Sequence, residues 1–347
     1  MTFTEELRGL LPLRPVGLLT LPSDVRAARR LADSLGPDDV FQGDPRGTRR
    51  TLSDLLVFGL GAARPSVVKH PRTARATTSL SRECDAVRRL GRDERLGSWR
   101  RLLPVVEECR LDGPLPLVVE SRLPGIEADV LLRRFPHLAG PVARSALGTI
   151  RELHRATGYA EEATDRVGDW IDPRLTVLGD EVRWCRRDEG AQALKALRAH
   201  LERDLVGRRL LVGWTHGDFH PGNVLTQGHG PLCGVIDWAG AVADGPSVLD
   251  CYTFVLTLRH QRGRRQFGRV VADVVRSGAL RPEDQRLLAG ARALVSDPRG
   301  QVAITLLTWL WHASGNLEKS ARYGRSHRWV ADNIVPVLRE VAAQETA

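Results

Sequence analysis

The chain of 347 residues is 42% apolar and 27% charged, which is the balance of a folded globular protein and excludes a disordered or fibrous one. Its length exceeds what one hydrophobic core usually fills and therefore predicts two lobes. The formal net charge is +9, but no nucleic-acid-binding motif accompanies it and no apolar run approaches the roughly 18 residues of a transmembrane helix, so we expect neither a nucleic-acid nor a membrane partner.

Residues 1–38 precede the segments that carry functional signals. We expect a strand over Val16–Leu21 and a helix over Ser23–Leu35, which form an extension that packs onto the first lobe. The opening Met-Thr-Phe-Thr-Glu-Glu is acidic rather than basic and predicts no signal peptide. The five cysteines of the chain are dispersed and form no Cys-x-x-Cys pair, which is typical of reduced thiols in the cytoplasm.

A glycine-containing loop is expected between a strand at Val40–Phe41 and a strand over Thr51–Phe58. The loop contains Gly43, Gly47 and Thr48 in Gln-Gly-Asp-Pro-Arg-Gly-Thr. Backbone N–H groups of such a loop, together with the Thr48 hydroxyl, suit the oxygen atoms of a phosphate. An ordinary hairpin turn explains the same glycines equally well.

The short β-branched run Ser66–Lys69 predicts a strand that ends in a lysine. Of the 51 lysines and arginines only Lys69, Lys195 and Lys319 are lysines. A compact ammonium and a planar guanidinium are not interchangeable at a crowded phosphate site, so the scarcity favours a specific role for Lys69. The alternative is a surface lysine at the end of a strand.

The next segment, Ser79–Leu90, predicts a helix whose apolar stripe contains one acid. At about 100° per residue Glu83 lies within this stripe, whereas Asp85 lies on the opposite face. A buried acid requires a cation, and Lys69 is the natural partner. The alternative is a glutamate at the edge of the stripe that reaches solvent. The stripe consists of Leu80, Cys84, Val87 and Leu90.

An apolar strand that ends at Pro124-Gly125 marks the boundary between the two lobes. Residues 119–123 form the expected hinge, which contains Glu120, Ser121 and Leu123. Solvated side chains at Glu120 and Arg122 are the alternative interpretation of their charge. We therefore expect a small, strand-rich lobe over residues 39–123 and a large, mainly helical lobe over residues 124–347.

Helical patterns dominate the large lobe. We expect helices over Ala143–Thr157 and Ala191–Val206. Everything from Ser247 onward is expected to be helical. The expected interruptions lie at Gly263, Pro282, Asp297-Pro298 and Gly324.

Three polar groups cluster around a predicted strand and hairpin. The strand Arg209–Thr215 leads into His-Gly-Asp-Phe-His-Pro-Gly-Asn, which places Asp218 and Asn223 in one loop. A hairpin from Asn223 to Ile236 then ends at Asp237, so Asn223 and Asp237 are expected at the same end. Two oxygen ligands there suit Mg²⁺ when phosphates and water supply the others. Turn chemistry alone is the alternative.

This pattern of His-x-Asp-x4-Asn, followed by an Asp after a short apolar strand, resembles the catalytic and metal loops of protein kinase-like enzymes. The variant with His-Pro-Gly-Asn and Ile-Asp-Trp is similar to the aminoglycoside phosphotransferase and choline kinase branch. The resemblance spans residues 40–258. It implies an α+β, bilobal protein kinase-like fold with a small β-rich lobe and a larger, mainly helical lobe.

The resemblance also implies an ATP-dependent transfer of the γ-phosphate to a hydroxyl of a small molecule, such as a sugar, a nucleoside or another metabolite. GTP is the alternative co-substrate. Asp218 would act as the catalytic base, and the pair Lys69–Glu83 would position the phosphates. The hinge backbone would bind the adenine edge. The implied nucleotide-binding residues are Lys69, Gly43, Gly47, Thr48, Glu120, Ser121 and Leu123, and the implied Mg²⁺ ligands are Asn223 and Asp237.

Neighbouring residues receive structural roles. His216 is expected to brace the catalytic loop, and Trp238 is expected to pack. Asp250 is expected to brace the metal loop rather than to bind metal. His220 either contacts the acceptor or the γ-phosphate, or packs within the loop.

Charge restricts the expected acceptor. The segment from Cys251 to the C-terminus holds 15 basic and 8 acidic residues. In relatives these helices surround the acceptor, and a polycationic acceptor needs an acidic lining, so we expect a neutral or anionic one. Two other classes remain open: a catalytically silent kinase-like nucleotide-binding module, and an Arg-rich polyanion binder. The second rests on Arg259, Arg262, Arg264, Arg265 and Arg269, which a solvated helix face also explains.

Overall fold

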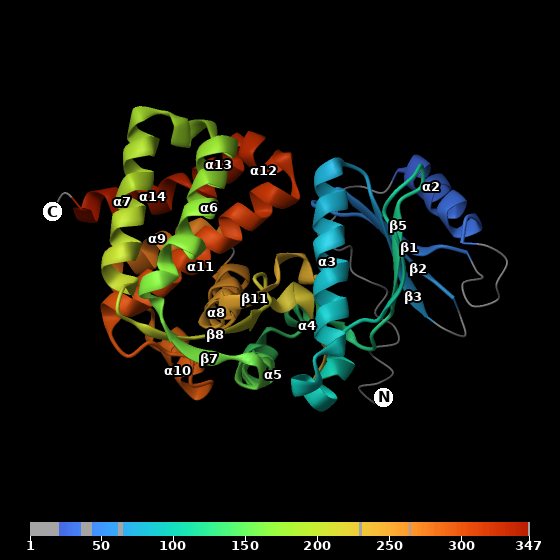
Figure 1. Cartoon of the computed structure of the whole chain (residues 1–347), viewed down its shortest axis with the longest axis horizontal. Coiled ribbons are helices and arrows are strands. Elements are labelled where there is room, and N and C mark those ends of the chain that lie inside the picture. The colour runs from blue at the N-terminus through green and yellow to red at the C-terminus, as the bar shows by residue number, and fades with distance from the viewer. Residues whose placement is uncertain (1–20, 36–43, 62–64, 229–230, 264, 346–347) are drawn as a thin grey trace. The chain divides into compact units, whose positions relative to one another are not determined.

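The structure is a computed structural model that describes residues 21–35, 44–61, 65–228, 231–263 and 265–345 (Figure 1). The expected strand at Val40–Phe41, nearly all of that at Val16–Leu21, and Gly43 lie outside the described residues. The chain divides into two compact units, Met1–Arg134 with Val224–Gly240, and Phe135–Asn223 with Ala241–Ala347. The hairpin that leads to Asp237 therefore belongs to the first unit, although the expected boundary near residue 123 assigned it to the second lobe.

A five-stranded antiparallel sheet forms the centre of the first unit, with the strand order β1-β2-β3-β5-β4. Helix α2 covers one face of the sheet and helix α3 covers the other (Figure 1). The bounds are α2 Pro22–Asp33, β1 Arg46–Arg50, β2 Leu55–Leu60, β3 Ser66–Pro71, α3 Ala74–Arg92, β4 Val106–Arg110 and β5 Leu117–Ser121.

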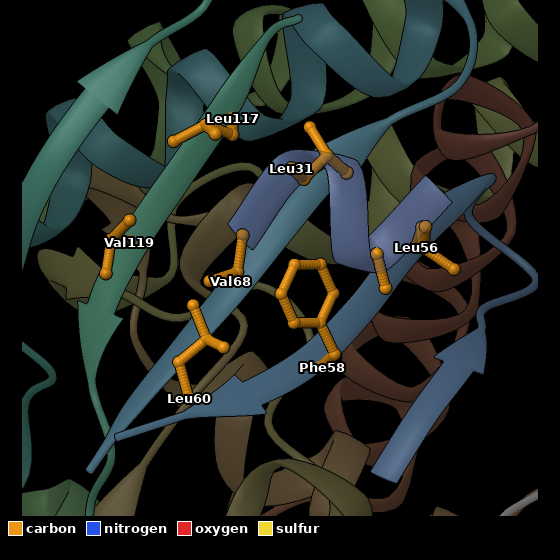
Figure 2. Close-up of a cluster of buried hydrophobic side chains, with 8 residues drawn as sticks. Leu31, Leu56, Phe58, Leu60, Val68, Leu117 and Val119 are labelled. Atoms are coloured by element: carbon orange, nitrogen blue, oxygen red, sulfur yellow. The ribbon is translucent and has the colours of Figure 1, made fainter. Parts of the chain in front are cut away.

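The period of two along each strand creates two apolar layers. Figure 2 shows the layer beneath α2, where Leu31 packs against Phe58 and Val68. The alternate residues point to the opposite face, where Val118 packs against Leu80 and Cys84 of α3. Because Lys69 pairs with Val118 in the sheet register, its side chain also lies on the face that α3 covers.

The rest of the first unit is built around a small sheet with the order β10-β9-β6. Val224 pairs with Val235, so the segments before β9 and after β10 leave the hairpin at the same end. The bounds are η1 Glu94–Leu102, β6 Ile126–Glu127, α4 Ala128–Arg134, β9 Val224–Thr226, β10 Leu232–Val235 and η6 Trp238–Gly240.

The second unit is mainly helical and contains a three-stranded sheet with the order β11-β8-β7. Its strands are β7 Tyr159–Glu162, β8 Arg209–Thr215 and β11 Val242–Pro246. Its α-helices are α5 Ala139–Thr157, α6 Val167–Glu181, α7 Asp188–Leu205, α8 Val248–Gly263, α9 Phe267–Ser277, α10 Pro282–Gly290, α11 Pro298–Lys319, α12 Ala321–Arg325, α13 His327–Asn333 and α14 Val335–Glu345. Among the described residues no helix is both long and apolar enough to span a bilayer.

The expected glycine loop is wrong in its described part. Gly47 and Thr48 lie inside β1, and the following strand begins at Leu55 rather than at Thr51. The register of β1 against β2 slips by one residue between Arg46 and Arg49, and Gly47 has φ of +63° at that bulge. Gly47 therefore serves a β-bulge, which needs the left-handed conformation that glycine adopts without strain.

The expected interruption at Gly324 is also wrong. Gly324 lies within α12, and the breaks fall at the serines on either side of that helix, Ser320 and Ser326. Both serines cap a helix by accepting a hydrogen bond from a backbone N–H. Side-chain capping, rather than the glycine, therefore sets the ends of the helices here.

Candidate active site

Lys69 lies between two buried carboxylates in the first unit. Its Nζ donates to Glu83 Oε1 at 2.8 Å and contacts Glu120 Oε2 at 2.8 Å. Glu83 comes from the buried stripe of α3, so the expected contact with Lys69 is present. The alternative of a solvated Glu120 is wrong: the residue is 3% exposed, because its pairing with Val67 in the sheet directs its side chain to the same face as Lys69.

One ammonium between two carboxylates leaves an excess of negative charge. Burial alone would lower the pKa of Lys69, but Glu120 and Glu83 outweigh this effect and raise it. Burial raises the pKa of Glu83, and the negative charges of Glu120 and Asp237 add to it, while Lys69 offsets part of the rise. The surrounding negative charge therefore lets Glu83 take up a proton at a higher pH than an exposed glutamate would.

Glu83 also connects this ion pair to the loop that contains Asp237. The backbone N–H of Trp238 donates to Glu83 Oε1 at 3.3 Å. The Trp238 ring is fully buried and meets Trp99 edge to face with ring centroids 6.0 Å apart, as expected of a packing residue. Asp237 has φ of +63°, a conformation that costs a non-glycine residue about 1 kcal/mol and often marks a functional position.

In the second unit, Asp250 holds the start of the catalytic loop. Its carboxylate accepts hydrogen bonds from the backbone N–H groups of His216 at 2.8 Å and Gly217 at 2.9 Å. Gly217 has φ of +78°, which suits glycine and turns two consecutive N–H groups towards one acid. Asp250 is thus structural, as expected. However, these hydrogen bonds join it to the catalytic loop and not to the metal loop that the sequence predicted.

His154 of α5 completes this anchor. Its Nε2 lies 2.9 Å from Asp250 Oδ2, and both side chains are fully buried. The other ring nitrogen, Nδ1, has no hydrogen-bond partner in the described part of the chain. Burial lowers the pKa of His154 despite the nearby Asp250, so the ring is neutral and donates through Nε2.

The two loop histidines each accept a hydrogen bond from the backbone. His216 Nδ1 accepts from the N–H of Asp218 at 3.2 Å, which is the bracing role expected for it. His220 Nδ1 accepts from the N–H of Gly222 at 3.0 Å, so the proton of its ring lies on Nε2. That Nε2 is 3.8 Å from Asp218 Oδ1, and His220 therefore both shapes the loop and borders the expected base.

Asp218 is surrounded by groups that favour its ionised form. Lys319 Nζ donates to its Oδ2 at 2.7 Å, and His312 Nδ1 lies 3.6 Å from its Oδ1. Burial would raise the pKa of Asp218, but Lys319 and the two histidines hold it well below its usual value. Sequence reasoning missed Lys319 and His312, although the scarcity of lysine was a usable signal for the first.

Asn223 is oriented for a cation. Its side-chain nitrogen donates to the backbone carbonyl oxygen of Asp218 at 2.9 Å, so the amide oxygen points the other way. Such a carboxamide oxygen suits Mg²⁺, which takes one or two protein oxygens and completes its shell with phosphates and water. Among the described residues, no three His, Cys, Asp or Glu side chains form a group that could hold a metal by themselves.

Three arginines of the cluster, Arg259, Arg265 and Arg269, are paired with acids. Arg259 binds Asp284 at 2.7 Å and is largely buried. Arg265 pairs with Asp273, and Arg269 pairs with Asp332. These ion pairs favour the interpretation of a salt-bridged helix face, and they remove most of the support for a basic wall or a polyanion-binding surface.

Comparison with known proteins identifies the family. A profile of the phosphotransferase enzyme family matches residues 53–274. A search of curated protein sequences finds no significant match. The small sheet-based unit and the larger helical unit confirm the predicted α+β, protein kinase-like fold, which solved phosphotransferases share.

Three solved structures illustrate the shared fold. The ADP-bound aminoglycoside phosphotransferase APH(2'')-Ib is 14% identical, with a TM-score of 0.56 over 90% of this chain and 97% of that chain. APH(3'')-Id from Streptomyces rimosus is 17% identical, with a TM-score of 0.51 over 82% and 98%. The macrolide 2'-phosphotransferase MphH from Brachybacterium faecium is 16% identical, with a TM-score of 0.50 over 93% and 98%.

Removing the ammonium of Lys69 is expected to destabilise the protein. Lys69→Met leaves Glu83 and Glu120 buried without their cation, which should lower the free energy of unfolding by about 3–5 kcal/mol. Adding Glu120→Gln should recover part of the loss, because one of the two carboxylates is then neutral. Urea denaturation of four proteins, the wild type, the two single variants and the double variant, measures this coupling. Losses that simply add would show that the two side chains do not interact.

The His154–Asp250 anchor is expected to weaken in acid. The pKa of His154 is lower in the folded chain than in the unfolded chain, where it is about 6.5. The contribution of neutral His154 to the free energy of unfolding is therefore complete above about pH 6.5. It falls as the pH decreases below this value, by at most about 1.4 kcal/mol per pH unit.

His154→Gln keeps a donor for Asp250 but cannot titrate, and it is the matched variant for this prediction. Because other histidines such as His200 also titrate, the relevant quantity is the difference in unfolding free energy between the two proteins from pH 8 to 5. This difference should narrow as the pH falls. A constant difference would contradict the assignment.

Proposed function

Because the chain belongs to the phosphotransferase enzyme family, we propose that it transfers the γ-phosphate of ATP to a hydroxyl group of a small molecule. The observation that carries the proposal is the environment of Asp218, an ionised carboxylate at the end of a buried strand, bordered by cationic and hydrogen-bonding side chains. Two of the similar structures are complexes, one with ADP and one with the ATP analogue AMP-PNP, which supports an adenine nucleotide here.

Asp218 is proposed to orient the acceptor. Its carboxylate accepts a hydrogen bond from the acceptor hydroxyl and takes that proton as the new O–P bond forms and the bond to the ADP oxygen breaks. The low pKa of Asp218 makes it a weak base. Positioning is therefore its main contribution, and proton removal comes late, which suits a loose transition state for phosphoryl transfer.

The nucleotide is proposed to contact the first unit. Lys69 binds the α- and β-phosphates, and Glu83 and Glu120 hold its ammonium in place. Thr48 and Gly47 remain candidates for phosphate contacts, now as residues of a strand, and Gly43 remains a candidate outside the described residues. At the hinge, the N–H of Ser121 already donates to Val105 at 2.8 Å, so we expect the adenine edge nearer to Leu123.

Asn223 and Asp237 are proposed to hold Mg²⁺ when the nucleotide is bound. Asn223 directly precedes β9 and Asp237 follows β10, and both segments leave the hairpin at the end where Val224 pairs with Val235. The ion would neutralise charge on the phosphates. The acceptor is proposed to be a sugar, a nucleoside or a similar hydroxylated metabolite, neutral or anionic, and the reaction to take place in the cytoplasm.

Asp218→Asn is expected to lower turnover by about 10²–10⁴-fold, because the amide neither takes the proton nor orients the hydroxyl in the same way. Nucleotide affinity should change little. Steady-state phosphorylation of a panel of hydroxylated metabolites, together with nucleotide titration, measures both quantities. Asp85→Asn, on the exposed face of α3, is the matched control. Near-normal turnover in Asp218→Asn would overturn the assignment.

Asp237→Ala is expected to abolish transfer and to weaken nucleotide binding only in the presence of Mg²⁺. The reason is that a lost carboxylate ligand affects the metal–nucleotide complex and not the nucleotide alone. Calorimetric titration with ATP, with and without Mg²⁺, separates the two effects. A wild-type protein that binds ATP equally well in both conditions would contradict the metal site.

A further inference from the structure

One face of α11 carries polar residues at the catalytic loop, although the helix is otherwise mostly apolar and buried. His312, Asn316 and Lys319 occupy positions i, i+4 and i+7, which lie on a single stripe of the helix. Two of these side chains reach Asp218, as described above. A polar stripe at this place is costly to bury and so requires a partner or a ligand.

Lys319 fixes the charge next to the reacting hydroxyl. Its Nζ is 2.7 Å from Asp218 Oδ2. An acceptor hydroxyl bonded to the same carboxylate lies about 2.7 Å from it. The ammonium is therefore within roughly 6 Å of the accepting oxygen and interacts strongly with any charge that the acceptor carries beside it.

His312 adds a directed donor. Asn316 Nδ2 lies 3.0 Å from His312 Nε2 and donates to it, which places a ring proton on Nδ1, the nitrogen that faces Asp218. The ring also packs against Phe267, with centroids 4.5 Å apart and ring planes inclined by 46°, which holds its orientation. The stripe therefore presents an ammonium and an N–H group, both of which favour acceptor oxygens.

We propose that the α11 stripe, defined by His312, Asn316 and Lys319, is an acceptor subsite that selects hydroxyls flanked by neutral oxygen or carboxylate groups and rejects hydroxyls flanked by an amine. The inference rests on the proposed function and assigns its acceptor class. It locates the discrimination at Lys319, because Arg259 and Arg269 are bound to acids of neighbouring helices, α10 and α13.

The test compares three matched acceptors: a neutral hexose, the corresponding hexuronate and the corresponding amino-hexose. The wild-type protein should phosphorylate the first two with kcat/KM at least about tenfold above the third. Lys319→Met should remove this preference, and Lys319→Arg should keep it. Lys195→Met, which removes the exposed lysine of α7, is the control and should leave the preference unchanged. Lys319→Gln serves as a second neutral variant if Lys319→Met does not fold.

Equilibrium binding of the same three ligands, measured by saturation-transfer NMR, separates this inference from the proposed function. Ranked binding that Lys319→Met abolishes, without turnover in the wild type, would support the subsite and contradict the kinase activity. An equal loss for all three ligands in Lys319→Met would show that Lys319 only supports Asp218, and would overturn the inference. A wild-type preference for the amino-hexose, or no binding of any ligand, would overturn it as well.

Discussion

The carboxylate of Glu83 joins three segments of the first unit through its hydrogen bonds, and the arrangement of these segments depends on it. It receives the ammonium of Lys69 from the sheet and the backbone N–H of Trp238 from the loop after β10. A buried charge is stable only when its hydrogen bonds are satisfied, so the sheet, α3 and the loop that contains Asp237 must adopt compatible positions. This coupling explains how Glu83, in the middle of an apolar stripe, fixes the positions of Lys69 and Trp238, which lie far apart in the sequence.

In the second unit, a different buried acid likewise joins separate segments by hydrogen bonds. Asp250 accepts from two consecutive N–H groups of the catalytic loop and from His154 on α5. The loop conformation therefore depends on two buried helices and not on its own sequence alone. A loop held in this way pays little reorganisation cost when a substrate binds, which is the condition for effective positioning.

Local sequence patterns predict much of this arrangement. The contacts that they miss join residues far apart in the sequence. A short, mostly apolar run gives β8 with its observed bounds, and the period of 3.6 places Glu83 on the buried face of α3. Glu120 was harder to interpret, because only the register of β3 against β5 directs its side chain to Lys69. Lys319 lies 101 residues from Asp218, and no local rule connects the two.

Net charge is a poor guide to the charge of a site, because a charge that is paired within the fold contributes little field elsewhere. Arg259, Arg265 and Arg269 are each bound to an acid, and the exposed ion pairs of Arg265 and Arg269 project little field across a pocket in physiological salt. A single buried ammonium behaves differently, since low dielectric and low exposure leave it weakly screened. Lys319 is such an ammonium. It too is bound to an acid, but that acid is Asp218, so under the proposed function its charge lies beside the accepting hydroxyl.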